Sequence, residues 1–348
     1  MKKAANNIAT IFLCLAWCSI SIYFIVNKYK GVSFQDPTRS TDSSRKVIID
    51  TDAGADDAIA ILLILKSKGF EVLAITCTYG NTYVDNVMRN VLKTLTIANR
   101  GDIPVYKGAQ RPFLNKYKSD DSFFGPDGFG NFSFTEAITA RVDESKHAAL
   151  ALLDLTKAHP GEITLLCIGP LTNVALAMTL DPLFATYLGK LIILGSSVSG
   201  NGNVSPNVEF NFGQDPESNS IVLNHSDIVS IIFPWETAKS SSIRMEWRTN
   251  VLGKLNSTIM NFLNKAERLS MTNNTEWISS DAMAATIMMW PESIEESTVT
   301  NVSPVTDGTA RGSVLVDYAH STGKPNNSEI IQRFNVTVFQ DALLKYLS

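Results

Sequence analysis

Four aspartates lie within eight residues of this sequence. The segment Asp50–Asp57 reads DTDAGADD. It follows the apolar run Val47–Ile49 and precedes a second apolar run, Ala58–Leu65. Ionised carboxylates this close together repel one another, and a cation between them removes that repulsion. Oxygen ligands of this kind select calcium or magnesium rather than zinc. The segment therefore predicts a divalent metal site beyond the end of a strand.

Other interpretations of this segment explain less of it. An aspartate at the start of a helix is commonly a cap, which accounts for Asp56 or Asp57 but not for all four. An EF-hand loop that begins at Asp50 needs a bidentate Glu at its twelfth position, where the chain has Ile61. A phosphotransfer site, with Asp50 as nucleophile and Asp52 as acid and base, also suits an Asp-x-Asp pair after a strand. That interpretation stays open at this point.

Length and composition favour a large globular domain. The chain has 348 residues, and 45% of them are hydrophobic, which is enough for a substantial core. Its formal net charge of −4 and the lack of a Lys/Arg cluster argue against nucleic acid as a partner. The four cysteines show no spacing typical of a disulfide framework.

The N-terminal segment differs from the rest of the chain. The stretch Ile8–Val26 carries no charge and follows Lys2 and Lys3. It is at the lower edge of the length of a membrane span and long for the core of a signal peptide. We interpret residues 1–30 as a signal peptide or signal anchor, with a possible membrane tether through residues 8–26. Residues 31–45 are interpreted as a linker and 46–348 as one globular domain.

This interpretation predicts a secreted protein, or one that its N-terminal anchor holds on the extracellular side. Asparagines in the acceptor pattern for N-glycosylation agree with that compartment. They are Asn131, Asn203, Asn224, Asn256, Asn273, Asn301, Asn326 and Asn335.

Apolar runs alternate with helical patterns through the middle of the chain. Continuous apolar runs are typical of strands buried on both faces; they are Val47–Asp50, Val72–Thr78, Ile103–Tyr106, Ile163–Ile168, Leu191–Leu194 and Ile228–Phe233. Helical periodicity marks Thr82–Asn99, Lys146–Ala158, Leu171–Leu180 and Pro216–Asn224. This alternation predicts an α/β fold with an open, mostly parallel, doubly wound sheet.

Polar segments that contain glycine follow several of these predicted strands. Gly80–Asn81 follows the second, Gly169–Asn173 the fourth, and Gly195–Ser197 and then Gly202–Pro206 the fifth. In open α/β sheets, ligands bind outside the carboxyl ends of the strands. We therefore expect these segments to meet the four aspartates at one edge of the sheet.

In these residues the chain resembles the nucleoside hydrolases, enzymes that cleave ribonucleosides to ribose and free base. The family includes inosine-uridine and purine-preferring nucleoside N-ribohydrolases. Four segments carry the resemblance, in the family's order: DTDAGADDA from Asp50, GPLTN from Gly169, GNVSPNVEFN from Gly202 and SDA from Ser280. Lesser matches lie at 79–81, 105–109, 125–130 and 312–314. Together they cover nearly everything from Lys46 onward.

The resemblance implies a calcium ion held by the carboxylates of Asp52, Asp57 and Asp281 and by the main-chain carbonyl of Ile168. Asp50 would not bind the ion itself but would orient the residues that do. The implied reaction is metal-assisted hydrolysis of the N-glycosidic bond through an oxocarbenium-like state. Asp52 would act as the catalytic base that takes a proton from the attacking water. The family commonly forms homodimers or homotetramers.

The resemblance also assigns the ribose site. A sugar diol needs carboxylate acceptors and amide donors in a dry pocket, and the family's positions supply both. They are Asp56, Asn81, Asn203, Glu209 and Asn211.

The chain departs from some members of the family at two positions where they have histidine. Here those positions are Ser280, before the metal-binding aspartate, and Phe124. An aromatic ring in place of a histidine suggests stacking on the base rather than protonation of it. We therefore predict purine nucleosides as substrates, with Phe123, Phe124 and Trp277 as the stacking candidates.

Two alternative functions remain. A calcium-dependent nucleoside binder that no longer cuts its ligand is compatible with the loss of the histidine, although the metal and ribose positions are all filled. A phosphatase-type hydrolase predicts a downstream lysine and a further acidic pair at the end of a later strand. The chain has Ser280–Asp281 and Val208–Asn211 instead, which fit that chemistry poorly.

Overall fold

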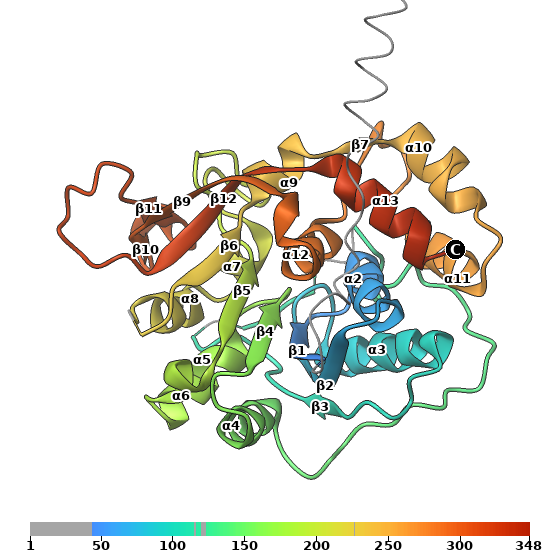
Figure 1. Ribbon diagram of the computed structural model, residues 1–348, viewed down its shortest axis with the longest axis horizontal. Helices are drawn as coiled ribbons and strands as arrows, with labels where there is room; N and C mark the ends of the chain where they lie inside the picture. The colour runs from blue at the N-terminus through green and yellow to red at the C-terminus, as the bar shows by residue number, and fades with distance from the viewer. Residues whose placement is uncertain (1–43, 115, 120–122, 226) are drawn as a thin grey trace, which may run out of the picture. The chain divides into compact units, whose positions relative to one another are not determined.

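The fold is built on an eight-stranded sheet, whose strands lie in the order β3-β2-β1-β4-β5-β6-β12-β9 (Figure 1). All neighbouring strands pair in parallel except β12 and β9, which are antiparallel at one edge. The α/β class and the open, mostly parallel sheet are thus as predicted. The strands are β1 Arg45–Thr51, β2 Phe70–Cys77, β3 Val105–Lys107, β4 Ile163–Cys167, β5 Lys190–Leu194, β6 Ser230–Phe233, β9 Ile294–Thr300 and β12 Ser328–Phe334.

The computed structural model describes residues 44–114, 116–119, 123–225 and 227–348. The predicted signal or anchor segment, its tether at residues 8–26 and the linker up to residue 43 therefore lie outside the described residues. In the described ranges, no helix is both long enough and apolar enough to cross a membrane. Arg45, which the sequence assigned to the linker, is the first residue of β1.

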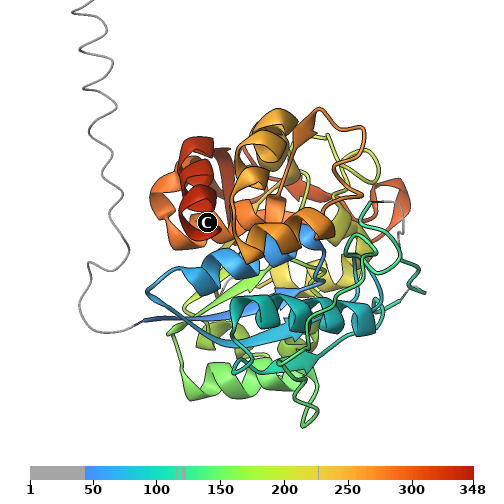
Figure 2. The same cartoon turned by 90° about the vertical axis from the view of Figure 1, so that its right-hand side faces the viewer.

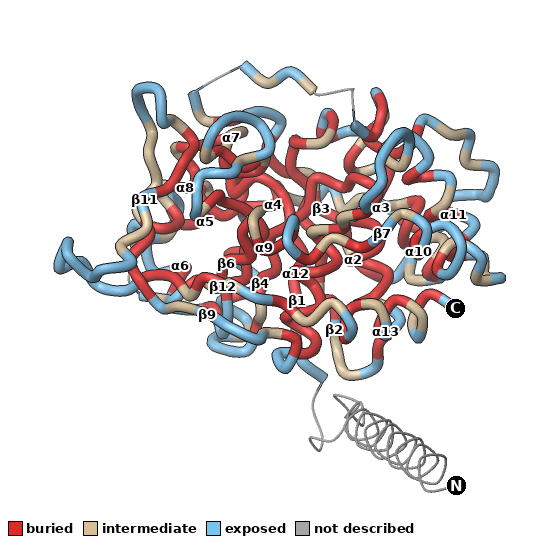
Figure 3. The backbone as a smooth tube through the Cα atoms, turned by 90° about the horizontal axis from the view of Figure 1, so that it is seen from above, coloured by how far each residue is buried: buried red, intermediate tan, exposed pale blue. Residues whose placement is uncertain are grey.

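Helices cover both faces of the sheet (Figures 1 and 2). The main ones are α2 Ala55–Lys66, α3 Val84–Ala98, α12 Ser280–Met289 and α13 Val336–Tyr346 on one face, and α4 Ala148–Ala158, α5 Thr172–Leu180, α6 Phe184–Tyr187 and α8 Pro216–Leu223 on the other. Alternate strand residues point to opposite faces. Ile48 and Leu165 accordingly join the apolar residues of α4, α5 and α8 in one buried cluster. Buried residues occupy the middle of the sheet, whereas the edge strand β9 is largely exposed (Figure 3).

The remaining elements are short. They are α7 Phe210–Gln214, α9 Trp235–Ser240, α10 Met245–Asn250, α11 Thr258–Ala266, the 3-10 turns Leu252–Lys254, Pro291–Ser293 and Gly308–Ala310, the pair β7 Ile243–Arg244 with β8 Glu276–Trp277, and the pair β10 Val302–Pro304 with β11 Val314–Val316.

The first turn of α2 lies directly beyond β1, because only three residues separate Thr51 from Ala55. The main-chain N–H of Gly54 donates to Asp57 Oδ2 at 2.7 Å, and two aspartates in the first turn suit the helix dipole. The rest of α2 is apolar and almost fully buried, since the helix contacts α12, α3, α11 and α13 as well as β2. Packing thus holds the aspartates rigidly at the end of β1.

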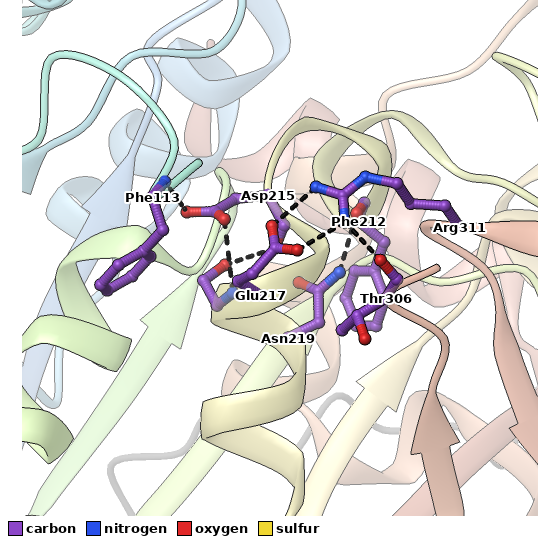
Figure 4. A network of polar contacts seen from close by, with 8 residues as sticks. Phe113, Phe212, Asp215, Glu217, Asn219, Thr306 and Arg311 are labelled. Carbon is purple, nitrogen blue, oxygen red and sulfur yellow. Dashed lines mark hydrogen bonds and ion pairs between the residues drawn. The ribbon is translucent and has the colours of Figure 1, made fainter. Parts of the chain in front are cut away.

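Polar contacts join the β10–β11 hairpin to α8 (Figure 4). The guanidinium of Arg311 donates to both carboxylate oxygens of Glu217 and to the carbonyl of Thr306. Asp215 caps α8 and accepts from the hydroxyl of Thr172 at 2.6 Å. These contacts hold the hairpin and the Thr172 end of α5 against α8.

Candidate active site

A cavity of about 610 Å³ lies beyond the carboxyl ends of β1, β4 and β5 and collects most of the predicted site residues. Those that line it are Asp52, Asp56, Asn81, Phe123, Phe124, Ile168, Asn203, Glu209, Asn211, Trp277 and Asp281. Asp50 and Asp57 are fully buried and are not among its lining residues. The polar segments that follow separate strands therefore meet, as expected from the topology of the sheet.

Three carboxylates from two helices form the tightest acidic group. Asp56, Asp57 and Asp281 each place one oxygen within 4.8 Å of the others. The first two stand in the first turn of α2 and the third in the first turn of α12. This group contains Asp56 where the predicted ligand set has Asp52. Oδ1 of Asp56 is buried and has no hydrogen-bond partner among the described residues.

The electrostatics of this group favour a bound cation. Burial raises the pKa of Asp57 and of Asp281 well above its usual range, and the neighbouring carboxylate of Asp56 raises each further. Burial also raises the pKa of Asp56 to about 6. Carboxylates that resist ionisation in this way become favourable as anions when a divalent cation is placed among them. An all-oxygen, acidic donor set fits a hard divalent ion such as calcium.

Asp52 adjoins this group but is turned toward the loop after β2. It is 1% exposed, and its Oδ2 accepts from the main-chain N–H of Asn81 at 2.7 Å. The Asn81 side chain donates to Asp57 Oδ2 at 3.3 Å, so one asparagine links two aspartates. Burial, followed by the charges of Asp57 and Asp56, raises the pKa of Asp52 well above its usual range.

Two loops, one with Gly80 and one with Gly169, approach Asp52 so closely that only glycine fits at these two positions. A Cβ atom on Gly80 would lie 2.0 Å from Asp52 Oδ2, and one on Gly169 would lie 2.9 Å from the main-chain nitrogen of Asp52. Both glycines belong to the segments that follow strands in the sequence. Their role is to let two loops pack against the same carboxylate.

Asp50 supports the site from within the sheet. Its Oδ1 accepts from the hydroxyl of Thr76 at 2.6 Å and from the side-chain amide of Asn173 at 2.8 Å. Burial raises its pKa to about 7. The same Asn173 amide reaches the carbonyl of Cys77, and its oxygen accepts from the N–H of Ala109. The supporting position predicted for Asp50 is therefore compatible with its contacts.

Glu209 and Asn211 stand at the start of α7. The Glu209 carboxylate caps this helix by accepting from the N–H groups of Asn211 and Phe212, and it also accepts from the N–H of Ser196. Burial nevertheless raises its pKa to about 7. The Asn211 side chain donates to the carbonyl of Ile168 at 3.3 Å, which places an amide beside the predicted main-chain ligand. Asn203 is exposed at the rim of the cavity.

The three aromatic candidates border the cavity in different environments. Phe123 is 53% exposed and Phe124 is 6% exposed. Their rings pack edge to face, with 4.6 Å between the ring centroids. Trp277 is 4% exposed, and its ring stacks on that of Phe339 with 6.1 Å between the ring centroids. Its indole N–H donates to the carboxylate of Glu267 at 2.6 Å. Trp277 is therefore both part of the core and part of the cavity wall.

The structure adds lining residues that the sequence did not single out. They are Leu194, Val204, Phe210, Trp235, Met245, Glu267, Ser270, Asn274, Glu276 and Ile278. Ser280, which stands where some members of the family have histidine, lines the cavity as well. Trp235 follows the carboxyl end of β6, so the strand-end rule would have found it. Glu267, Ser270 and Asn274 follow α11, where no strand ends and no motif marks them.

The sequence profile of the inosine-uridine preferring nucleoside hydrolases matches residues 47–341. The chain belongs to this family.

Named relatives and solved structures agree with this membership. The probable uridine nucleosidase 2 of Arabidopsis thaliana is 41% identical over 190 residues, which is 54% of this chain and 58% of that protein. This chain thus spans less than two thirds of the plant relatives that it matches. The pyrimidine-specific ribonucleoside hydrolase RihB of Escherichia coli strain SE11 is 30% identical over 296 residues, 82% of this chain and 91% of that protein.

Solved structures extend the likeness to the whole fold. A plant nucleoside hydrolase superposes with a TM-score of 0.81 at 29% identity and covers 87% of this chain and 98% of its own. An inosine-guanosine nucleoside hydrolase gives the same TM-score and coverage at 30% identity.

The comparisons correct the predicted location. The matched relatives are plant and bacterial proteins named as nucleosidases or ribonucleoside hydrolases, which is at odds with a secreted or anchored protein. The expectation of a secreted or membrane-tethered protein is therefore wrong, and the glycosylation pattern no longer supports one.

Proposed function

We propose that this protein hydrolyses the N-glycosidic bond of ribonucleosides to give ribose and free base. One observation carries the proposal: a single cavity combines an acidic cluster suited to a divalent cation with the amide and carboxylate groups that a ribose diol requires. Family membership and the printed activities of the relatives support the same reaction.

The proposed metal is calcium. Asp57 and Asp281 would hold it, together with Asp52, the Ile168 carbonyl and the adjacent Asp56. When bound, the ion supplies a Lewis acid that polarises water and the sugar hydroxyls. The test of this assignment is metal content and calcium titration of the purified protein, since neither depends on turnover.

The chain's own residues carry the remaining chemistry. Asp52 takes a proton from the attacking water, a role that its buried position in the cavity wall favours. Glu209 and Asn211 hold the ribose from α7, and Asn81 and Asn203 hold it from two loops. The carboxylates around the ring stabilise the positive charge that develops on the sugar.

The preferred base is a separate proposal. The aromatic rings of Phe123, Phe124 and Trp277 at the cavity favour stacking on a purine. The competing candidate is uridine, because the plant relatives are named as uridine nucleosidases and the bacterial ones as pyrimidine-specific ribonucleoside hydrolases. Initial rates with inosine, guanosine, adenosine, uridine and cytidine at equal concentration decide between them; a strong preference for uridine would refute the purine proposal.

The charge of the cavity speaks against a phosphatase. Its lining includes the carboxylates of Asp52, Asp56, Glu209, Glu267, Glu276 and Asp281, whereas none of its described lining residues is Lys, Arg or His. An anionic phosphate ester would find only the proposed metal to bind it. A neutral nucleoside meets no such repulsion.

The deciding experiment is an assay of reducing sugar after incubation with calcium and each of the five nucleosides. We expect release of ribose with at least one of them. Nucleoside binding without any release of ribose would overturn the proposed hydrolysis and leave the non-catalytic binder as the function.

A further inference from the structure

A carboxylate outside the acidic cluster binds the loop that carries Asn203, and the Asn207 side chain accepts from the N–H of Gly200 in the same loop. Residues 196–208, hereafter the 196–208 loop, join the end of β5 to the segment before α7. The side chain of Glu236, from the first turn of α9, accepts from the hydroxyl of Ser197 at 2.7 Å and from the N–H groups of Val198 and Ser199 at 3.0 and 2.8 Å. It also accepts from the N–H of Asn201 at 3.3 Å. One hydroxyl and three main-chain N–H groups, all from residues 197–201, thus donate to one carboxylate.

The conformation of the loop requires such support. Ser196 and Asn207 have φ values of 71° and 61°, which are unfavourable for residues with a Cβ atom. A Cβ on Gly202 would lie 2.0 Å from the carbonyl oxygen of Ser205, so the loop turns sharply there. Val198 to Asn201 are half-buried or exposed, and apolar packing therefore contributes little to holding them. Charge-assisted hydrogen bonds are among the strong ones available to a loop of this kind.

The supported loop ends at the cavity. The N–H groups of Asn203 and Val204 both donate to the carbonyl of Val208, which closes the tip of the loop. Asn203 and Val204 line the cavity, and so does Trp235, the residue next to Glu236. The first turn of α9 therefore supplies one residue of the cavity wall, Trp235, and the carboxylate that binds the adjacent 196–208 loop.

We propose that Glu236 is a positioning residue that holds Asn203 in place for the ribose. It acts through the 196–208 loop and does not itself border the cavity. The link to the ribose rests on the function proposed above, whereas the effect on the loop does not. Because Asn203 would contact the sugar before and during the reaction, losing its position weakens binding more than it slows the chemical step.

The matched control is Glu217. Like Glu236, it is a half-buried glutamate in the second position of a short helix, but it pairs with Arg311 rather than with a loop of the cavity. Replacing either glutamate by Ala removes one favourable interaction with a helix dipole. Differences between Glu236→Ala and Glu217→Ala therefore report on the loop. Glu236→Gln keeps one acceptor oxygen and should show a partial effect.

The experiment combines hydrogen–deuterium exchange of the free protein with steady-state kinetics. In Glu236→Ala we expect the amides of residues 198–201 to exchange about 10- to 100-fold faster, with Glu236→Gln between it and the wild type and Glu217→Ala unchanged. KM should rise about 10- to 100-fold while kcat changes little. Unchanged exchange in Glu236→Ala would overturn the role in the loop. Faster exchange with the KM of the Glu217→Ala control would overturn the positioning of Asn203. A wild type that releases no ribose refutes the proposed function instead, and the exchange data still decide the role of Glu236.

Discussion

Several carboxyl groups of the candidate site are buried, and burial disfavours their ionised form. Asp52, Asp57 and Asp281 are each at most 3% exposed, and burial raises the pKa of all three. A group whose pKa is raised on folding stabilises the fold only while it is protonated, and this contribution is lost as pH rises through the folded pKa. Without a cation, the site therefore reduces the stability of the protein at neutral and higher pH.

The substitution Asp52→Asn separates the effect of this carboxylate on catalysis from its effect on stability. Because the proposed general base is removed, we expect kcat to fall about 10²- to 10⁴-fold. Because a buried carboxylate that resists ionisation is replaced by an isosteric amide, the metal-free variant should unfold at a higher temperature than the metal-free wild type at pH 8. Kinetics and thermal unfolding in the presence of a chelator measure both. Near-normal turnover would contradict the assignment of the base.

Gly80→Ala tests the packing of the loop against Asp52. The added methyl group would overlap Asp52 Oδ2, so either the carboxylate or the Gly80–Asn81 loop must move. Misplacement of this kind is expected to reduce kcat/KM about 100-fold while the fold is kept. Gly101→Ala is the control, since its Cβ would approach no atom closer than 3.2 Å. Equal activity of the two variants would refute the argument from close packing.

The sequence indicated those candidate site residues whose types are unusual together. The four aspartates of 50–57 could be predicted because packed carboxylates have few structural explanations. Glu236 could not be predicted, because a glutamate in the first turn of a helix is ordinary, and its importance depends on a loop some 35 residues away in the chain. Glu267 was equally hidden, since only the fold brings it to Trp277 and the cavity.

At the scale of elements, β1, β2 and α5 meet at one asparagine. The buried side chain of Asn173, at the start of α5, binds Asp50 of β1, the carbonyl of Cys77 at the end of β2 and the N–H of Ala109. A Cβ on Gly108 would lie 2.2 Å from it, so no larger residue fits there. These contacts hold the carboxyl ends of β1 and β2 against the start of α5.

Asn173→Ala should therefore destabilise the fold. It leaves the N–H of Ala109 without its acceptor and removes one of the two donors to Asp50 Oδ1. Buried polar groups left unpaired are costly. We expect the free energy of unfolding to fall by about 2–4 kcal/mol, as measured by urea titration. The exposed Asn224→Ala should change it by less than about 0.5 kcal/mol. Similar values for both variants would contradict the structural role of Asn173.

The elements predicted from the sequence are those with an unbroken apolar run or a clear helical period. All six predicted strands exist. Five of them lie inside the sheet, where strands are buried on both faces, and the sixth, β3, is a short edge strand. β9 was missed because it is an exposed edge strand that reads IEESTVT, and β12 because it reads SEIIQRF, with only two consecutive aliphatic residues. Edge position and tertiary pairing, not local pattern, determine these two strands.

At the scale of the whole molecule, the acidic cavity links stability to pH and to metal. Burial raises the pKa of Asp56 to about 6 and that of Asp50 and Glu209 to about 7. Between their ordinary values and these values the folded protein binds more protons than the unfolded chain, so stability falls as pH rises through this window. A cation bound only by the folded state opposes that fall.

Calcium should therefore stabilise the protein more at pH 8 than at pH 5.5, because protons compete for the same carboxylates at the lower pH. With calcium at about 100 times its Kd, the gain of about 2.7 kcal/mol corresponds to a rise in Tm of about 5 °C for a chain of this size. Thermal unfolding with calcium, with magnesium and with a chelator measures the effect at both pH values. Asp281→Asn, which removes one carboxylate of the cluster, should lose most of the rise while its metal-free Tm at pH 8 stays equal to or above that of the wild type. A wild-type Tm at pH 8 that does not respond to calcium would contradict the metal site, since a ligand that binds only the folded state must raise it.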